Sequence, residues 1–244
     1  MHVKIVSKTN IDTTYLTHLM KECTEENGGF EFIKNVQGPE GLMAYIARVS
    51  SNKQDNPSYA GLIKYCMSHG HWSILETANA CFEIQTSRAI SAQMLRHRSF
   101  SFQEFSQRYA AVDDSGIELF VARRQDSKNR QNSIDDLSQE IKDEWEIRQK
   151  QNWQQTFEHY TWALDKGIAK EIARAVLPLQ TTTKIYMNGT IRSWVHYVNL
   201  RSDPSTQLEH RQIAEEIKQQ MILHFPVVAE AAGWTDEQES RKDI

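Results

Sequence analysis

The sequence predicts a single α+β domain, with strands scattered among helices and a helical C-terminal half. Hydrophobic residues make up 39% and charged residues 25% of the 244 positions, which is enough apolar material for a packed core and excludes a disordered or fibrous chain. Apolar residues alternate with polar ones in some segments and recur at helical spacing in others, so both kinds of element are expected. No internal repeat and no shift in charge composition marks a boundary, so we expect one domain over residues 1–244.

Local patterns define each predicted element in the first hundred residues. Strands are assigned where apolar residues alternate, and helices where they recur three or four positions apart behind a capping residue or a proline. In chain order, the predicted elements are a strand over 2–7, a helix capped by Asp12 or Thr13, a helix from Pro39 to Val49, a helix from Pro57 to a stop at Gly70, a strand over 78–86, and a helix that Ser87 caps and that ends among the arginines at 96–98. The strand over 78–86 is the clearest, because Ala80, Phe82 and Ile84 share one face.

The second half of the chain begins with a polar stretch of mixed charge over 123–133, which we expect to be an exposed, mobile loop. Apolar residues at helical spacing then predict a long helix over 138–165, whose Trp145, Trp153 and Trp162 are expected in the core. The remaining predicted elements are a short helix over 168–177 ended by Pro178, a strand over 180–187, a helix over 190–200, and an amphipathic helix over 204–223 opened by Asp203.

Charge and cysteine content exclude several classes of protein. The net charge is −4, so the chain is not expected to bind nucleic acid, and any anion site requires a local cluster of positive charge. No apolar run approaches the ~20 residues that span a bilayer, and the N-terminus lacks the apolar stretch of a signal peptide. Cys23, Cys66 and Cys81 match no zinc spacing, and we interpret them as reduced, buried thiols. A cytoplasmic protein without a metal or a membrane partner is therefore expected.

The densest chemical feature is the segment Arg96–Tyr109, which reads RHRSFSFQEFSQRY. Its arginines and its histidine face a single glutamate within an otherwise acidic chain. The planar guanidinium matches phosphate, and each charge-assisted hydrogen bond contributes about 1.5–3 kcal/mol. The alternative is a helix C-terminus whose arginines satisfy the last carbonyls and pair with surface carboxylates.

The same segment closely resembles the signature of the flavin-dependent thymidylate synthases, RHRxxSxxxxSxRY, at every fixed position. Further segments resemble this family in the expected order: Ala47–Ser50, His69–His71 with Glu76, Ala173–Arg174 before Leu177–Leu179, and Asn199–Arg201. The resemblance covers about residues 40–225, whereas 122–150 has no clear match and is expected to be a variable insertion.

The resemblance implies a homotetramer that converts dUMP to dTMP at active sites shared between subunits. It also implies a central, mostly antiparallel sheet flanked by helices. Methylenetetrahydrofolate would donate the carbon, NADPH the electrons, and FAD would carry the hydride.

By the same resemblance, Arg201 is the catalytic residue that polarises the uracil ring. The positions that match dUMP-binding positions are Gln93, Met94, Leu95, Arg96, Glu104, Phe105, Ser106, Gln107, Arg108, Arg174 and Arg201. Those that match flavin-binding positions are Ser73, Arg96, His97, Arg98, Glu104, Thr190, Arg192 and His196, with His71 near the flavin and the folate path. Thr190 stands where the family commonly has Asn, which could weaken contacts with the adenine end of FAD.

The cysteines give separate support for an electrostatic mechanism. The unrelated class of thymidylate synthase adds a Cys thiolate to C6 of the pyrimidine, but no cysteine here has a basic neighbour in the sequence that would lower its pKa. Activation must then come from the field around the ring, and an arginine beside N3 and O4 would stabilise the developing charge.

Other interpretations of single residues remain open at this point. Arg174 could be a snorkelling arginine, Arg192 and His196 two exposed residues on one helix face, and Arg201 a partner of a helix dipole. The alternatives for the whole chain are a protein that binds single-stranded nucleic acid through Arg96–Tyr109, or an inactive homologue kept as a structural oligomer.

Overall fold

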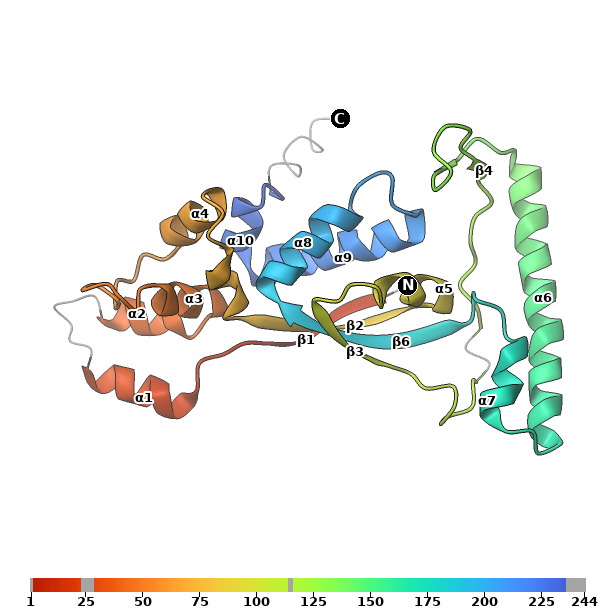
Figure 1. The fold of residues 1–244 in the computed structure, drawn as a ribbon, viewed down its shortest axis with the longest axis horizontal. Coiled ribbons are helices and arrows are strands. Elements are labelled where there is room, and N and C mark those ends of the chain that lie inside the picture. The colour runs from red at the N-terminus through yellow and green to blue at the C-terminus, as the bar shows by residue number, and fades with distance from the viewer. Residues whose placement is uncertain (1, 23–28, 114–115, 236–244) are drawn as a thin grey trace. The chain divides into compact units, whose positions relative to one another are not determined.

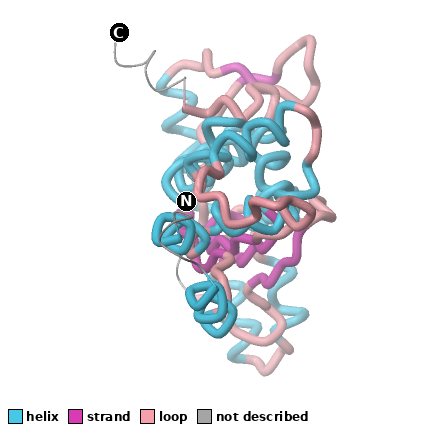
Figure 2. The backbone as a smooth tube through the Cα atoms, turned by 90° about the vertical axis from the view of Figure 1, so that its left-hand side faces the viewer, coloured by secondary structure: helices cyan, strands magenta, loops and turns pink. Residues whose placement is uncertain are grey.

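The computed structural model describes residues 2–22, 29–113 and 116–235. A four-stranded sheet has the order β1-β2-β6-β3, and Figure 2 shows its strands next to one another. The strands are β1 (His2–Lys8), β2 (Asn79–Ser87), β6 (Thr182–Thr190) and β3 (Phe100–Glu104).

Hydrogen bonds at the strand ends show that these neighbours are antiparallel. Thr9, just after β1, donates its backbone N–H to Asn79 at the start of β2 at 3.0 Å. Phe105, just after β3, donates to Lys184 near the start of β6 at 2.9 Å. Arg88, just after β2, donates to Thr181, just before β6, at 3.0 Å. An antiparallel sheet with helices confirms the expected α+β class.

Alternation within the strands explains which side chains are buried. In β2, Ala80, Phe82 and Ile84 are buried as predicted, and in β6, Ile185 and Met187 are buried in the same way. Strand β3, the neighbour of β6 at the edge of the sheet, was not predicted, because Arg96–Tyr109 was interpreted as the end of a helix and a loop. Its Phe100 is nevertheless buried.

The described residues group into two compact units. Unit 1 comprises Met1–Val3, Glu83–Met187 and Arg201–Ile213, and unit 2 comprises Lys4–Phe82, Asn188–Leu200 and Ala214–Ile244. Each unit is described by itself below. The boundary falls inside β1, β2 and β6, so each of these strands contributes residues to both units.

Unit 2 is mainly helical (Figure 1). It contains α1 (Thr13–Glu22), α2 (Gly29–Val36), α3 (Pro39–Ala47), α4 (Ala60–Ser68), the 3-10 helix η2 (Trp72–Glu76), most of α8 (Ile191–Arg201), the second part of α9 (Leu208–His224), and α10 (Pro226–Ala231). Asp12 caps α1 as predicted, because its carboxylate accepts the N–H groups of Thr14 and Tyr15 at 2.9 and 3.0 Å.

Helices α2 and α3 pack closely at Gly41. A Cβ at this position would lie 2.0 Å from the carbonyl oxygen of Asn35, so glycine allows the approach.

Glu40 is a buried carboxylate beside the start of α10. It is 5% exposed and accepts the N–H of Val228 at 2.8 Å. Phe225 provides no side-chain cap for α10, so the Glu40 carboxylate takes that role. Burial raises the pKa of Glu40 to about 7, although the Val228 N–H opposes this effect.

Unit 1 contains the remaining elements. They are α5 (Arg88–Met94), the short hairpin of β4 (Arg124–Gln125) and β5 (Ser133–Ile134), α6 (Gln139–Asp165), α7 (Lys170–Ala173) and the 3-10 helix η3 (Arg174–Val176). Ser87 caps α5 as predicted, Ser138 caps α6, and Gly167 follows α6 with a φ of 78°. Figure 1 shows α7 beside α6, where Tyr160 and Ala173 belong to one buried cluster.

Several predicted features are wrong in their extent or burial. The segment 123–133 is largely exposed but contains β4 and reaches β5, because Arg124 and Gln125 pair with Ile134 and Ser133. Helix α9 begins at Leu208 instead of residue 204, because Asp203 accepts the N–H and Oγ–H of Ser205 in a turn.

Helix α4 likewise begins at Ala60 instead of Pro57, and β6 extends to Thr190 instead of ending at Met187. Helices α2 and α10 were not predicted. Trp145 and Trp162 are 43% and 59% exposed, so these two are not core residues.

None of the helices in the described ranges has the length and apolar character needed to cross a membrane.

Candidate active site

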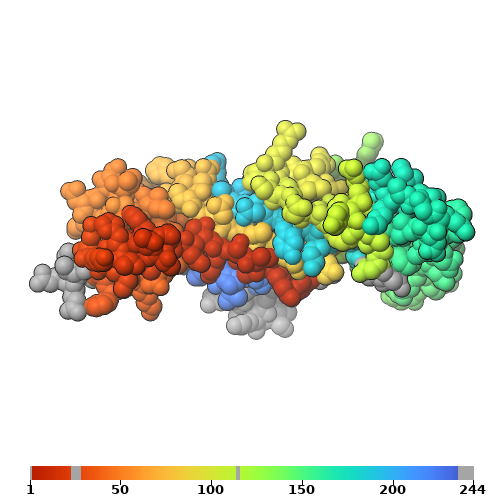
Figure 3. All heavy atoms as spheres, turned by 90° about the horizontal axis from the view of Figure 1, so that it is seen from below, coloured from red at the N-terminus to blue at the C-terminus, as the bar shows by residue number. Residues whose placement is uncertain are grey.

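The three residues Arg96, His97 and Arg98 lie in the turn that joins α5 to β3 in unit 1. The turn begins where α5 ends, and the N–H of His97 donates to the carbonyl of Met94 at 3.0 Å. Arg96 and Arg98 are exposed and His97 is half-buried. Figure 3 shows the region around residues 100–110 (yellow-green) at the surface, beside β6 (cyan). The arginine-rich segment is therefore accessible to a ligand.

Arg201 lies against this turn. Its Nε donates to Nε2 of His97 at 2.9 Å, so that nitrogen of His97 acts as an acceptor and carries no proton in this arrangement. His210 is fully buried, and its ring lies 6.4 Å from that of His97. Burial, together with the positive charge of Arg201 and the nearby His97, lowers the pKa of His210 to about 3. Arg201 therefore has an uncharged imidazole, His210, in its vicinity at neutral pH.

A pocket of about 410 Å³ lies elsewhere in unit 1. Its polar lining includes Arg88, Gln107 and Arg174, and Pro178 and Leu179 line its apolar part. Gln107 is 5% exposed, and its Nε2 has no hydrogen-bond partner among the described residues. A buried amide without a partner is costly, so this donor is suited to a ligand acceptor. The pocket thus unites Gln107 and Arg174, two residues predicted to bind dUMP.

Glu104 fixes the N-terminal end of α5. Its Oε1 forms an ion pair with Arg88 at 3.0 Å and accepts the hydroxyl of Ser91 at 2.7 Å and that of Thr183 at 3.1 Å. Because Arg88 and Gln93 stand five positions apart on α5, the helix rise separates their backbones by about 7.5 Å. A single short helix therefore carries residues of both the pocket and the Arg201 region.

The other predicted nucleotide-binding residues differ in exposure. Met94 is fully buried, whereas Leu95 and Phe105 are 42% and 40% exposed. Ser106 is exposed, and Arg108 forms an exposed ion pair with Glu171 at 3.4 Å. Met94 therefore contributes packing beneath the turn, while the side chains of Leu95, Phe105 and Ser106 are accessible.

Four arginines of unit 1 have no ion-pair partner within the described ranges, whereas Arg88 and Arg108 pair with Glu104 and Glu171. Within residues 2–22, 29–113 and 116–235, no carboxylate forms an ion pair with Arg96, Arg98, Arg174 or Arg201. The helix-end alternative for Arg96 and Arg98, in which they pair with surface carboxylates, is therefore not what the structure shows. Four guanidinium groups without an anionic partner are the donor set that a phosphate ester requires.

The remaining flavin-binding candidates lie in unit 2. Arg192 and His196 are both exposed on α8, one turn apart, and Arg192 forms an ion pair with Glu76 at the end of η2. Thr190 caps α8 by accepting the N–H of Ser193 at 3.1 Å, so fewer of its hydrogen-bonding positions remain for a cofactor.

Two further flavin-site candidates lie near η2. Ser73 and His71 are exposed, and His71 precedes η2 and lies edge-on to the ring of Tyr65, 6.3 Å away. Both side chains are therefore accessible to a ligand.

The described cysteines have no features of a nucleophile. Cys66 is buried, whereas Cys81 is only partly buried, contrary to expectation, and burial raises the pKa of both thiols. Cys23 lies outside the described residues. In the described part of the chain, no group of histidine, cysteine and carboxylate residues could hold a metal ion.

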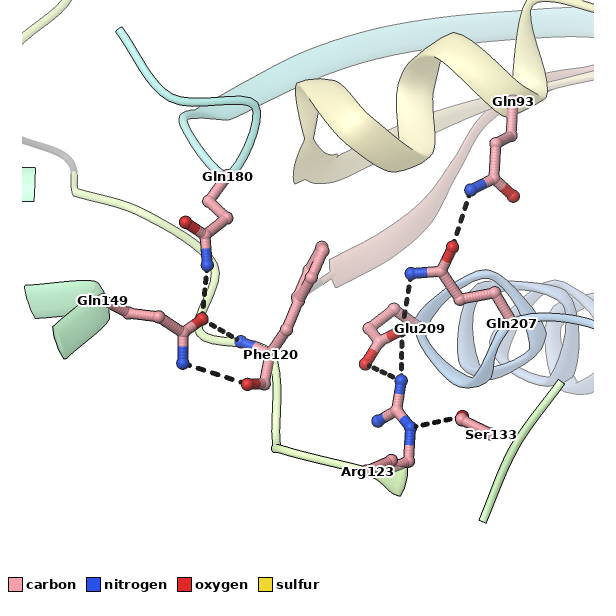
Figure 4. Close-up of polar contacts among 8 residues, drawn as sticks. All are labelled: Gln93, Phe120, Arg123, Ser133, Gln149, Gln180, Gln207 and Glu209. Atoms are coloured by element: carbon pink, nitrogen blue, oxygen red, sulfur yellow. Dashed lines mark hydrogen bonds and ion pairs between the residues drawn. The ribbon is translucent and has the colours of Figure 1, made fainter. Parts of the chain in front are cut away.

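A polar network that the sequence analysis missed lies next to Gln93. Gln93 Nε2 donates to Gln207 Oε1 at 2.7 Å, and Gln207 in turn donates to Glu209, which is paired with Arg123 (Figure 4). No short motif distinguishes these residues, and 86 positions separate Arg123 from Glu209. Local spacing could not have found them.

Comparison with known proteins agrees with the predicted resemblance. The family model described as thymidylate synthase complementing protein matches residues 31–227. A flavin-dependent thymidylate synthase of Synechocystis sp. is 52% identical over 196 residues, which cover 80% of this chain and 90% of that protein. A probable flavin-dependent thymidylate synthase of Paramecium bursaria Chlorella virus 1 is 50% identical over 204 residues, covering 83% and 94%.

The fold also has a counterpart among solved structures. The crystal structure of a UMP/dUMP methylase from Streptomyces cacaoi, bound with 5-Br dUMP, has a TM-score of 0.73 and 24% identity, and covers 94% of this chain and 93% of that chain. At this identity the likeness is one of fold. The family match and the two close relatives, together with the intact arginine segment, show that the chain belongs to the flavin-dependent thymidylate synthases, a family of methyltransferases.

Proposed function

We propose that the chain catalyses the reductive methylation of dUMP to dTMP in the cytoplasm of its cell or, for a viral chain, of the host. Methylenetetrahydrofolate would donate the carbon and NADPH the hydride, so that C5 of the pyrimidine gains a methyl group and tetrahydrofolate and NADP⁺ leave. The observation that supports this best is the set of arginines without carboxylate partners, Arg96, Arg98, Arg174 and Arg201, in a family whose relatives are named for this activity.

In this proposal, dUMP binds in unit 1. Gln107 and Arg174 line one pocket, and the orphaned Nε2 of Gln107 offers a donor to the nucleotide. Arg96, Ser106 and Arg108 would add further donors, and Gln93, Met94, Leu95, Glu104 and Phe105 would complete the nucleotide contacts. The buried donor of Gln107 favours a ligand that can satisfy it.

Arg201 is the residue that activates the ring. Its Nε is held by His97 at 2.9 Å, so the guanidinium is oriented before the substrate arrives. A preorganised positive charge beside N3 and O4 stabilises the negative charge that develops there and makes C5 more nucleophilic. No cysteine addition is needed, in agreement with the raised thiol pKa values of Cys66 and Cys81.

The donor set fits a flavin nucleotide. Each unit supplies donors of the kind that bind a diphosphate. Unit 1 supplies exposed Arg98 and half-buried His97, and unit 2 supplies Arg192, His196, Ser73 and Thr190. When bound, FAD would carry the hydride from NADPH to the nucleotide. His71 would lie near the flavin and the folate.

We further propose a homotetramer with active sites shared between subunits. Four chains of 28.3 kDa give a particle of about 113 kDa, which light scattering can measure. A monomer that still turned over dUMP would overturn this part of the proposal.

The decisive experiment is a visible spectrum of the purified protein. The protein should be yellow, and NADPH with dUMP should bleach the flavin band, with dTMP appearing once methylenetetrahydrofolate is added. Protein that stays colourless and cannot be reconstituted with FAD contradicts the proposal. A preference for oligonucleotides over dUMP, with steep salt dependence, would support the nucleic-acid alternative instead.

A further inference from the structure

A chain of partly buried, hydrogen-bonded side chains ends on Gln93, one of the residues proposed to bind dUMP. Gln93 Nε2 donates to Gln207 Oε1 at 2.7 Å, and Gln207 Nε2 donates to Glu209 Oε2 at 2.9 Å. Nη2 of Arg123 donates to both carboxylate oxygens of Glu209, at 2.8 and 3.0 Å. Figure 4 shows these contacts in one line from α5 to the segment that precedes β4.

The charged end of this chain is well shielded from water. The side chains of Arg123 and Glu209 are 11% and 6% exposed. Nε of Arg123 donates to Ser133 Oγ in β5 at 2.9 Å, which holds the guanidinium in place. A buried ion pair adds little stability because both charges lose their hydration, so stability alone does not account for this pair.

The ion pair instead determines how the side-chain amides of Gln207 and Gln93 are oriented. An ionised carboxylate only accepts hydrogen bonds, so Gln207 must turn its NH₂ group toward Glu209. The oxygen of Gln207 then faces Gln93, which must donate in turn. Each amide orientation follows from the charge of Glu209.

The far side of Gln93 is defined in the same way. Its Oε1 lies 3.3 Å from Nδ1 of His210, which is fully buried. A neutral imidazole that donates from Nδ1 agrees with this orientation. One N–H and one acceptor position of the Gln93 amide then remain, both in fixed orientation, and these are the groups that would hydrogen-bond to a nucleotide.

We propose that Arg123, Glu209 and Gln207 are positioning residues that fix the orientation of the Gln93 carboxamide for dUMP. This inference rests on the proposed function, since it assumes that Gln93 contacts the nucleotide. It extends the site to β4–β5 and the start of α9, in which no residue was predicted to contact the substrate.

The test is the affinity for dUMP of the flavin-loaded protein, measured by calorimetry. Glu209→Gln keeps the shape of the side chain, but its amide can present either the oxygen or the NH₂ group to Gln207. The variant should therefore bind dUMP about 3- to 10-fold more weakly, as for one lost hydrogen bond. Asp136→Asn is the matched control, because Asp136 pairs with Arg124, the residue next to Arg123, at 2.5 Å but is 45% exposed. That variant should bind dUMP as the wild type does.

A double-mutant cycle separates positioning from simple support. If Glu209 acts through Gln93, then Glu209→Gln should add little to the loss already caused by Gln93→Ala. An effect of Glu209→Gln that persists in full beside Gln93→Ala overturns the inference, as does wild-type affinity in Glu209→Gln alone. If Glu209→Gln fails to fold, Gln207→Leu interrupts the chain while keeping the ion pair, and it should weaken dUMP binding by a similar factor.

The two proposals fail in distinguishable ways. Wild-type protein that does not bind dUMP overturns both of them. Wild-type protein that binds and methylates dUMP, with variants that bind it equally well, overturns only the positioning role.

Discussion

Glu40 should make the free energy of unfolding depend on pH in a direction opposite to that of an ordinary surface carboxylate. Its pKa is raised from 4.5 to about 7, chiefly by burial. Below about pH 4.5 both the folded and the unfolded states hold the proton. Between pH 4.5 and 7 the unfolded state releases it while the folded state keeps it, so stability falls as pH rises, and above pH 7 this contribution is fully lost. At about 1.4 kcal/mol per pKa unit, the loss is about 3 kcal/mol.

Glu40→Gln isolates this effect. The amide oxygen can still accept the N–H of Val228, but the side chain no longer titrates. Urea unfolding at several pH values between 4 and 8 should show stability falling with pH by about 3 kcal/mol more in the wild type than in Glu40→Gln. Glu31→Gln, an exposed change in the same unit, serves as the control and should follow the wild type. His224, whose pKa burial lowers, gives the opposite slope but is common to all three proteins. Equal slopes in the wild type and in Glu40→Gln would refute the reasoning.

Three further predictions test separate parts of the structure. The Arg201→Ala variant should retain FAD, measured by visible absorbance, but its kcat should fall about 10²- to 10³-fold because one preorganised charge is lost. The Arg98→Ala variant should instead lose flavin. Equal flavin loss in both variants would contradict this division of roles. Cys66→Ala and Cys81→Ala should each keep kcat within about twofold in a dTMP assay, whereas loss of a true nucleophile costs about 10⁶-fold. Gly41→Ala should destabilise the protein by about 2–3 kcal/mol in denaturant unfolding, because its Cβ would meet the Asn35 carbonyl at 2.0 Å, and unchanged stability would show that α2 can move aside.

Elements with a strong local pattern could be predicted from the sequence. The alternation over 78–86 predicted β2, and the capping residues Asp12, Ser87 and Ser138 each begin the expected helix. Elements with only a short pattern were missed. Strand β3 alternates Phe100 and Phe102 with polar residues, but over five positions within an arginine-rich segment, and its pairing with β6 is what identifies it.

The candidate site divides in the same way. Arg96–Tyr109 and Arg201 could be found because each lies in a short contiguous motif, the second being Asn199–Arg201. The pairing of Arg123 with Glu209 could not, because it joins positions 86 residues apart and depends on tertiary packing. The hydrogen bond from the Ser193 N–H to Thr190 Oγ1, which caps α8, likewise could be identified only from the structure.

The fully buried His210 behaves as a permanent dipole across the range of pH in which enzymes work, since its imidazole gains a proton only near pH 3. Acidification from pH 8 to 6 therefore brings no new cation from this residue to compete with Arg201 for an anionic uracil. Any change in turnover over that interval must originate in other groups, in the nucleotide itself or in the reductant.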